Sequence, residues 1–302
     1  MYHPDIMAGA INMRQMNLYV HAAWITALIL ILAGTARIYA ENIQERTAGA
    51  VTLDESWTYA GNSAIHTGAA EMYLADESKG SGRKNITVCV NAGHGTSGGE
   101  GAKTLSHPDG TPKVTGGTNA AGETWSIAIS SGTTFLDGTT EAAANLQVAM
   151  ELKRLLLEDG YDVLMIRESE DVQLDNIART VIANNCADLH IAIHFDSTDS
   201  NKGCYYCSVP DVASYRAMEP VASNWQDHDR LGSCLVQGMQ QEGLTVFGDG
   251  TLPTDLTQTS YSTIPSVDVE VGDRASDHSA EACAAYARGL KAGVDLFCSE
   301  GL

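Results

Sequence analysis

Short apolar runs that alternate with amphipathic stretches constrain the fold of this chain more than any other feature of its sequence. Residues 86–91, 161–167 and 189–194 have the length and composition of buried strands. Between them, residues 141–158 and 174–184 place apolar side chains at helical spacing. This β-α-β-α-β order predicts a parallel sheet with helices packed on it, because parallel strands need crossover connections.

The second half of the sequence continues the pattern. Residues 204–209 and 266–271 are expected to form further strands, and helices are expected near residues 223–242 and 276–297. We therefore expect an α/β fold, in which a mostly parallel twisted sheet is flanked by helices in a single domain. Residues 85–302 are numerous enough to build one hydrophobic core.

The first forty residues differ from the rest of the chain. Residues 16–36 carry no charged side chain, Arg14 precedes them, and small residues end the run at Ala36. This pattern is typical of a secretory signal peptide cleaved after Ala36. The run is also long enough, about 20 residues, to span a bilayer as an uncleaved anchor. In either case we expect residues 1–40 to export the protein to the extracellular space or cell wall, and to provide its only membrane contact.

Residues 41–84 are rich in Gly, Ser, Thr, Ala and Glu and show no sustained period of 2 or 3.6. Such a stretch predicts a polar linker with loose structure.

The net charge excludes one class of partner. The 302 residues include 18 Lys and Arg against 38 Asp and Glu, a formal charge of −20 at pH 7. A nucleic acid backbone would repel this chain, so we expect no nucleic acid partner.

The chain contains seven cysteines, which are Cys89, Cys186, Cys204, Cys207, Cys234, Cys283 and Cys298. Outside the cell cysteines commonly pair, but an odd number leaves at least one thiol unpaired or bridging two chains. Cys204 and Cys207 form a C-x-x-C, which could be a redox motif or half of a zinc site. It lies in a strand-like run with no second C-x-x-C, so a structural role is favoured.

Candidate catalytic residues lie where the predicted strands end, which is where open α/β sheets gather their chemistry. His94 follows the first strand between two glycines, His194 ends the third, and Glu270 lies near the end of a later strand. Glu141 opens the helix that follows the long first loop. Two imidazoles and a carboxylate at one point are the ligand set of a catalytic zinc. Singly, each residue has an ordinary alternative, such as a solvated histidine or a glutamate that complements a helix dipole.

The segments around these residues resemble the zinc-dependent N-acetylmuramoyl-L-alanine amidases, the cell-wall hydrolase family called amidase type 3. The family's Asp-x-Gly-His-Gly, at the end of an apolar run, is similar to residues 88–95, and its Glu-opened helix to residues 141–149. Its Ser-Ile-His is similar to residues 192–194, and its Pro-x-x-x-x-Glu-x-Gly to residues 265–272. A fifth pattern is similar, in register, to Arg167, Asp171, Leu174, Arg179 and Ala183-Asn184. The five motifs occur in order within residues 86–298.

The resemblance implies a zinc ion held by His94, Glu141 and His194, with Glu270 as the catalytic acid/base. It also implies peptidoglycan as the substrate and the amide between the lactyl group of N-acetylmuramic acid and L-alanine as the bond cut. Zinc can polarise the scissile carbonyl while a carboxylate that is not a ligand moves the proton. Two alternatives are a non-catalytic cell-wall binding protein on the same fold and a zinc peptidase acting on the stem peptide. The presence of all four residues argues against the non-catalytic alternative.

Several positions depart from the family's motifs. Asn91 replaces the usual Asp, Asp196 replaces a frequent Asn, and residues 273–275 replace Phe-Leu-x-Asn. None removes a proposed ligand, but each could alter the hydrogen bonds around the ligands or the substrate rim. The largest departure is an insert at about 96–139, which could wall the cleft or be a surface loop. Its Trp125 could stack on a sugar ring.

Other polar or reactive side chains are expected to lie outside the chemistry. His190 shares a strand face with His194 but lies deeper along the strand, so we expect a core histidine. Cys89 is expected to act as a small buried hydrophobic residue. Three further histidines lie in or near polar stretches and are expected to be solvated: His107, His228 and His278.

Overall fold

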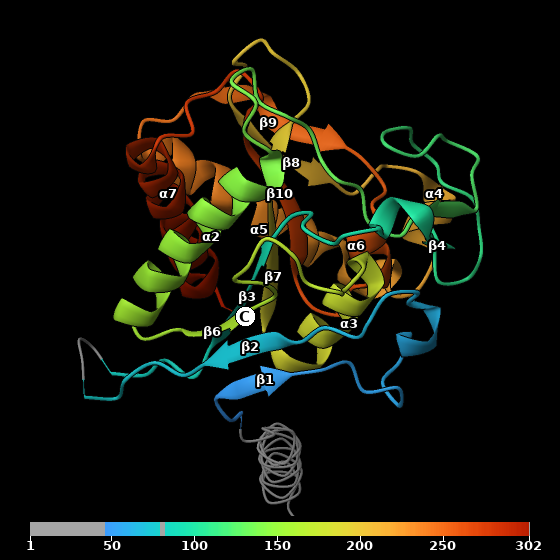
Figure 1. Ribbon diagram of the computed structural model, residues 1–302, viewed down its shortest axis with the longest axis horizontal. Coiled ribbons are helices and arrows are strands. Elements are labelled where there is room, and N and C mark those ends of the chain that lie inside the picture. The colour runs from blue at the N-terminus through green and yellow to red at the C-terminus, as the bar shows by residue number, and fades with distance from the viewer. Residues whose placement is uncertain (1–45, 79–81, 302) are drawn as a thin grey trace, which may run out of the picture. The chain divides into compact units, whose positions relative to one another are not determined.

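An eight-stranded sheet organises the unit that begins at Thr47 (Figure 1). The computed structural model describes residues 46–78 and 82–301. In spatial order, the strands are β1 (Gly49–Val51), β2 (Ala70–Tyr73), β6 (Asp162–Met165), β3 (Thr87–Ala92), β7 (Leu189–Asp196), β10 (Ser266–Asp273), β8 (Cys204–Ser208) and β9 (Val246–Pro253). A separate two-stranded sheet joins β4 (Lys103–Leu105) to β5 (Trp125–Ile127).

The centre of the large sheet is parallel. β6, β3, β7 and β10 run in one direction, β8 is antiparallel to β10, and β9 is parallel to β8. At the other edge, β1 and β2 are antiparallel to each other, and β2 is antiparallel to β6. The predicted α/β domain with a mostly parallel sheet flanked by helices is therefore confirmed.

Helices cover both faces of the sheet (Figure 1). One face packs against the long helices α2 (Glu141–Glu158), α5 (Val221–Gln241) and α7 (Ala280–Ser299). The opposite face packs against α3 (Asn176–Cys186), which joins a second apolar cluster with β2 and β6. The short helices are η1 (Ala60–Asn62), η2 (Gly99–Gly101), α4 (Ala213–Arg216) and α6 (Thr257–Tyr261).

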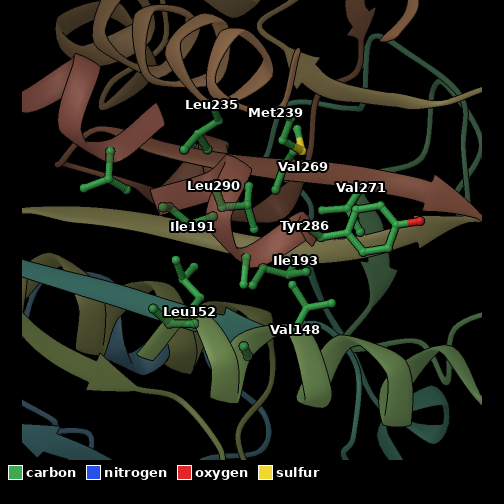
Figure 2. Packing of buried hydrophobic residues seen from close by; sticks show 14 of the residues in the cluster. Val148, Leu152, Ile191, Ile193, Leu235, Met239, Val269, Val271, Tyr286 and Leu290 are labelled. Carbon is green, nitrogen blue, oxygen red and sulfur yellow. The ribbon is translucent and has the colours of Figure 1, made fainter. Parts of the chain in front are cut away.

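Strand β10 shows how the sheet separates its core from its polar face. Its sequence alternates valine with polar residues, and side chains of a strand point alternately to opposite faces. Val267, Val269 and Val271 join the core against the long helices, where Figure 2 shows Val269 beside Met239 and Val271 beside Tyr286. The polar residues between the valines therefore face the other side of the sheet. That polar face forms the floor of the cleft described below.

Helix α2 begins where its sequence predicts. The Thr140 hydroxyl accepts a hydrogen bond from the backbone N–H of Ala143 at 3.3 Å, which caps the helix. Gly160 follows the helix at φ 88°, a left-handed conformation that glycine adopts without strain. The buried stripe of the helix, which includes Val148 and Leu152, packs into the core (Figure 2). The cap and the stripe together fix Glu141 in the first turn.

The prediction of a loose polar linker over residues 41–84 is wrong for its described part. Residues 49–51 and 70–73 are strands of the main sheet, and Ala70 and Met72 are buried with Leu164 in one apolar cluster. The sequence hides these strands because each is only three or four residues long and lies among turns. The second strand is ordered by pairing with β6 and the first by pairing with the second, rather than by a pattern of their own. The fold therefore begins before the predicted residue 85.

The predicted signal peptide or anchor at residues 1–40 lies outside the described residues and stays a prediction. Among the residues that the structure describes, no helix combines the length and apolar character needed to cross a membrane.

Candidate metal centre and cleft

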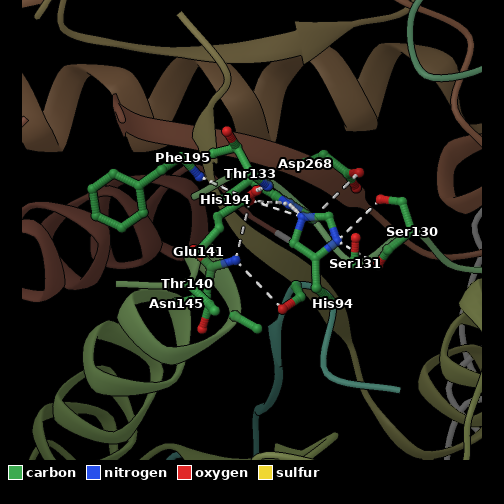
Figure 3. A network of polar contacts seen from close by, with 12 residues as sticks. His94, Ser130, Ser131, Thr133, Thr140, Glu141, Asn145, His194, Phe195 and Asp268 are labelled. Atoms are coloured by element: carbon green, nitrogen blue, oxygen red, sulfur yellow. Dashed lines mark hydrogen bonds and ion pairs between the residues drawn. The ribbon is translucent and has the colours of Figure 1, made fainter. Parts of the chain in front are cut away.

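Three of the four predicted site residues converge at the carboxyl ends of β3 and β7 (Figure 3). The Nε2 atom of His94 lies 2.8 Å from Oε1 of Glu141. The Nδ1 atom of His194 lies 3.0 Å from the same oxygen and 3.1 Å from Nε2 of His94. No other group of three or more such ligand residues occurs in the described part of the chain.

Local backbone geometry brings these side chains together. His94 adopts φ 63° and Gly95 φ 73°, so the chain turns sharply at the end of β3. A Cβ atom on Gly93 would lie 2.2 Å from Cε1 of His194, and one on Gly132 would lie 2.6 Å from Cδ2 of His94. The backbone can approach the site only because both positions lack a side chain.

The surrounding hydrogen bonds orient the donor atoms. Nδ1 of His94 lies 2.9 Å from the carbonyl oxygen of Ser130, so it is placed to donate and to leave Nε2 with its lone pair. Oε2 of Glu141 accepts a hydrogen bond from the backbone N–H of Thr133 at 2.8 Å. Burial opposes ionisation of Glu141, but the two imidazoles outweigh it and hold the pKa of this carboxyl well below its ordinary value.

The donor set fits a divalent metal. Two imidazole nitrogens and one carboxylate oxygen lie within about 3 Å of one another, and one side of the triad opens on a cleft. Two nitrogens that face each other at 3.1 Å can share at most a proton between them, whereas a cation would accept lone pairs from both.

Glu270, the fourth predicted residue, lies beside the triad on β10, where it is in register with His194 of β7. Its Oε2 atom is buried and has no hydrogen-bond partner among the described residues. Burial raises the pKa of Glu270 to about 8, helped by Glu141 and opposed by His194. A carboxyl that gains and loses its proton near neutral pH is suited to acid/base chemistry.

The cleft beside the triad has a volume of about 540 Å³. Its floor is the polar face of the sheet, with Asn91, Asp196, Asp268 and Glu270 among its residues. Two of its walls come from the insert at about 96–139 and from residues 252–258, which run from the end of β9 into α6.

The insert is held in place by a buried carboxylate. Asp255 accepts a hydrogen bond from the backbone N–H of Val114 at 2.7 Å, and its Oδ1 lies 3.0 Å from Nζ of Lys113. Its Oδ2 lies 2.9 Å from Nε2 of His107. The insert is therefore a fixed wall of the cleft. Trp125, proposed to stack on a sugar, is 53% exposed on β5 and does not line this cleft.

Two of the remaining histidine predictions are wrong. His107 and His228 are each only 1% exposed, because the insert folds over the first and α5 packs the second against β10. His278 is partly buried and contacts Asp137 at 3.1 Å. His190 is fully buried in β7 beside Ser266, so its prediction as a core histidine is confirmed.

The structure also shows the surroundings of Asn91 and Asp196, which depart from the family's motifs, and of two cysteines. Oδ1 of Asn91 accepts a hydrogen bond from Arg179 at 3.0 Å. Asp196 binds Lys202 and Tyr205 rather than a candidate ligand. Burial raises the pKa of the Cys207 thiol well above its ordinary value, which is the opposite of a reactive thiol and agrees with a structural C-x-x-C. Cys89 is fully buried, as predicted.

Sequence reasoning missed Asp268. This residue lies on the cleft floor, with Oδ2 4.0 Å from Nε2 of His194 (Figure 3). The alternation of Ser266-Val-Asp-Val-Glu270 was a usable signal, because it places residue 268 on the same face as Glu270.

Comparisons with known proteins identify the family and the fold. Residues 88–287 match a family model described as N-acetylmuramoyl-L-alanine amidase. A crystal structure of an N-acetylmuramyl-L-alanine amidase from Mycobacterium smegmatis is 18% identical with TM-score 0.58, covering 72% of this chain and 98% of that one. The apo form of an N-acetylmuramyl-L-alanine amidase from Mycobacterium abscessus is 19% identical with TM-score 0.56. The match covers 70% of this chain and 98% of that one. An amidase from Nostoc punctiforme is 17% identical with TM-score 0.50, covering 72% and 99%. No curated protein matches the sequence.

Proposed function

Because this chain belongs to the N-acetylmuramoyl-L-alanine amidase family and is an enzyme of that class, we propose that it hydrolyses one defined bond of peptidoglycan. That bond is the amide between the lactyl group of N-acetylmuramic acid and the L-alanine of the stem peptide. We further propose that residues 1–40 export the enzyme to the extracellular space or cell wall.

The convergence of His94, Glu141 and His194 carries the proposal. In it, these residues hold one zinc ion through Nε2, a carboxylate oxygen and Nδ1 respectively. Nitrogen and oxygen donors in a set of three, with the remaining side open to a cleft, are the ligands of catalytic zinc sites. A bound zinc would supply Lewis-acid polarisation of the scissile carbonyl and activation of water.

Glu270 supplies the acid/base function in this proposal. It lies in register with His194, faces the cleft and has a buried oxygen without a hydrogen-bond partner among the residues that the structure describes. Its carboxylate would accept the proton of the attacking water and return it to the amine of L-alanine as the amide breaks. Burial raises the pKa of Glu270, which favours the protonated form that returns the proton to the amine.

The first experiment measures zinc content and muropeptide products for the full chain, its His94→Ala variant and its Glu270→Gln variant. We expect one zinc per chain in the wild type, no zinc and no turnover in His94→Ala, and zinc without turnover in Glu270→Gln. Wild-type turnover in Glu270→Gln would show that the role given to Glu270 is wrong.

The products separate the alternatives. An amidase leaves a free L-alanine amine and an intact lactyl carboxylate, whereas a peptidase on the stem peptide leaves L-alanine attached to the glycan. A chain that binds muropeptides and releases no product would support the wall-binding alternative instead.

A further inference from the structure

We infer that Asp268 is a positioning residue for His194: its carboxylate accepts the Nε2–H of that imidazole and so strengthens the metal site. This inference rests on the proposed function, because it takes His194 as a metal ligand. It assigns a role to a residue that the family motifs leave open.

The first step assigns the two ring nitrogens of His194 to their partners. Nδ1 points into the triad, 3.0 Å from Oε1 of Glu141, so Nε2 points away from it. Oδ2 of Asp268 lies 4.0 Å from that Nε2 (Figure 3). If Nδ1 donates its lone pair to a metal, the neutral ring carries its proton on Nε2, toward Asp268.

The second step is that the sheet fixes Asp268 in this place. Asp268 is in register with Ala192 of β7, and Glu270 with His194, so the aspartate is the diagonal neighbour of the histidine. Val267 and Val269 on either side are buried in the core and hold the strand.

The third step is that no other described residue donates a hydrogen bond to the buried Oδ1 of Asp268 or forms an ion pair with its carboxylate. Its Oδ1 is buried without a hydrogen bond, and its only ion-pair contact among the described residues is with His194. A buried carboxylate without a donor is costly and is not kept for stability. Asp196, the other nearby aspartate, differs because Lys202 and Tyr205 already occupy it.

A carboxylate behind a ligand histidine has a known physical effect. It fixes the ring's tautomer and orientation and makes the ligand nitrogen more basic, and removing it typically weakens metal binding 10- to 100-fold. The two atoms are 4.0 Å apart, so the inference requires them to approach by about 1 Å to reach hydrogen-bond length.

The test measures zinc affinity by competition with a chelator on the full chain, for wild type, Asp268→Asn and Asp268→Leu. Asp227→Asn serves as the control, because it removes the same charge from an exposed site on α5. We expect zinc affinity to fall at least tenfold in Asp268→Leu and by less in Asp268→Asn, which keeps an acceptor oxygen. The control should bind zinc like the wild type.

Thermal unfolding of the metal-free proteins checks folding. We expect the metal-free Asp268 variants to be at least as stable as the wild type, because an unpaired buried charge is removed, while the stabilisation produced by added zinc shrinks. Wild-type zinc affinity in both Asp268 variants would overturn the inference. If those variants kept wild-type zinc affinity but lost turnover, Asp268 would instead be a participant in the reaction. A wild-type chain that binds no zinc would overturn the proposed metal site itself.

Discussion

The side chains of His107 and Asp255 meet in the interior, with 2.9 Å between Nε2 and Oδ2, and neither is more than 1% exposed. One belongs to the insert and the other to the segment after β9, so this contact joins the two walls of the cleft. Lys113 approaches the same carboxylate. Asp255 therefore connects the stability of the domain to the shape of the cleft.

Asp255→Asn is expected to lower the free energy of unfolding by about 3 kcal/mol, because it leaves Lys113 buried without its counter-charge. The insert should also become sensitive to limited proteolysis. Asp211→Asn removes an exposed partner of Arg216 and should change neither property. Chemical denaturation together with proteolysis measures both. Equal stability of Asp255→Asn and wild type would show that the buried contact is not what holds the insert.

Gly132→Ala is expected to disrupt the metal site directly. Its Cβ would lie 2.6 Å from Cδ2 of His94 and 2.7 Å from Oε2 of Glu141, so the two side chains would have to move apart. We expect zinc affinity, measured with a chelator, to fall more than tenfold. Gly138→Ala is the matched control, since Gly138 also has a positive φ, 94°, but nothing lies within 4 Å of its Cβ position. Both variants carry a left-handed alanine, which costs about 1 kcal/mol, so only the clash distinguishes them.

The sequence predicts the parts of this fold that carry their own periodic signal. Helix α2 has a cap, an apolar stripe and a terminal glycine, and the central strands are continuous apolar runs, so both were foreseeable. Strands β2 and β9 were not. The first is four residues long, and the second contains Gly248 and Gly250, so their order depends on a neighbouring strand.

The same distinction holds for the site. His94, Glu141 and His194 were found through motifs, because a strand end or a helix start places each of them. Asp255 and the backbone groups of Ser130 and Thr133 act through contacts between segments distant in sequence, which no local pattern reveals. The roles of all three predicted ligands remain predictions until a metal is measured.

Two buried histidines predict how stability depends on pH. Burial lowers the pKa of His228 to about 4, and burial with the nearby charge of Arg179 lowers that of His190 to about 3. Between these values and the ordinary pKa near 6.5, the unfolded chain binds protons that the folded chain does not. Their contribution to stability is therefore complete above about pH 6.5 and is lost as the pH falls toward 4.

We expect the unfolding free energy of the metal-free protein to fall by about 1.4 kcal/mol per pH unit for each histidine over this range. His228→Asn keeps an oxygen to accept the Ser266 N–H, now accepted at 3.0 Å by Nδ1, but cannot take up a proton. Denaturation at several pH values should give a slope shallower by that amount. An unchanged slope would mean that His228 is not the group responsible.

Truncation tests whether the segment before residue 85 belongs to the fold. A chain that starts at Thr47 keeps β1 and β2, whereas one that starts at Asn85 exposes the edge of β6 and the apolar cluster under Met72. The chain that starts at Asn85 also lacks Arg83, whose Nη2 lies 2.6 Å from Oδ2 of the buried Asp162.

We expect the shorter chain to be at least about 3 kcal/mol less stable, because it leaves a buried carboxylate without its partner and a strand edge open. Arg83→Ala in the longer chain separates the ion pair from the strands and should account for part of that loss. Equal denaturation midpoints for the two truncated chains would contradict the prediction. They would mean that β1 and β2 are accessory to the sheet rather than part of its cooperative core.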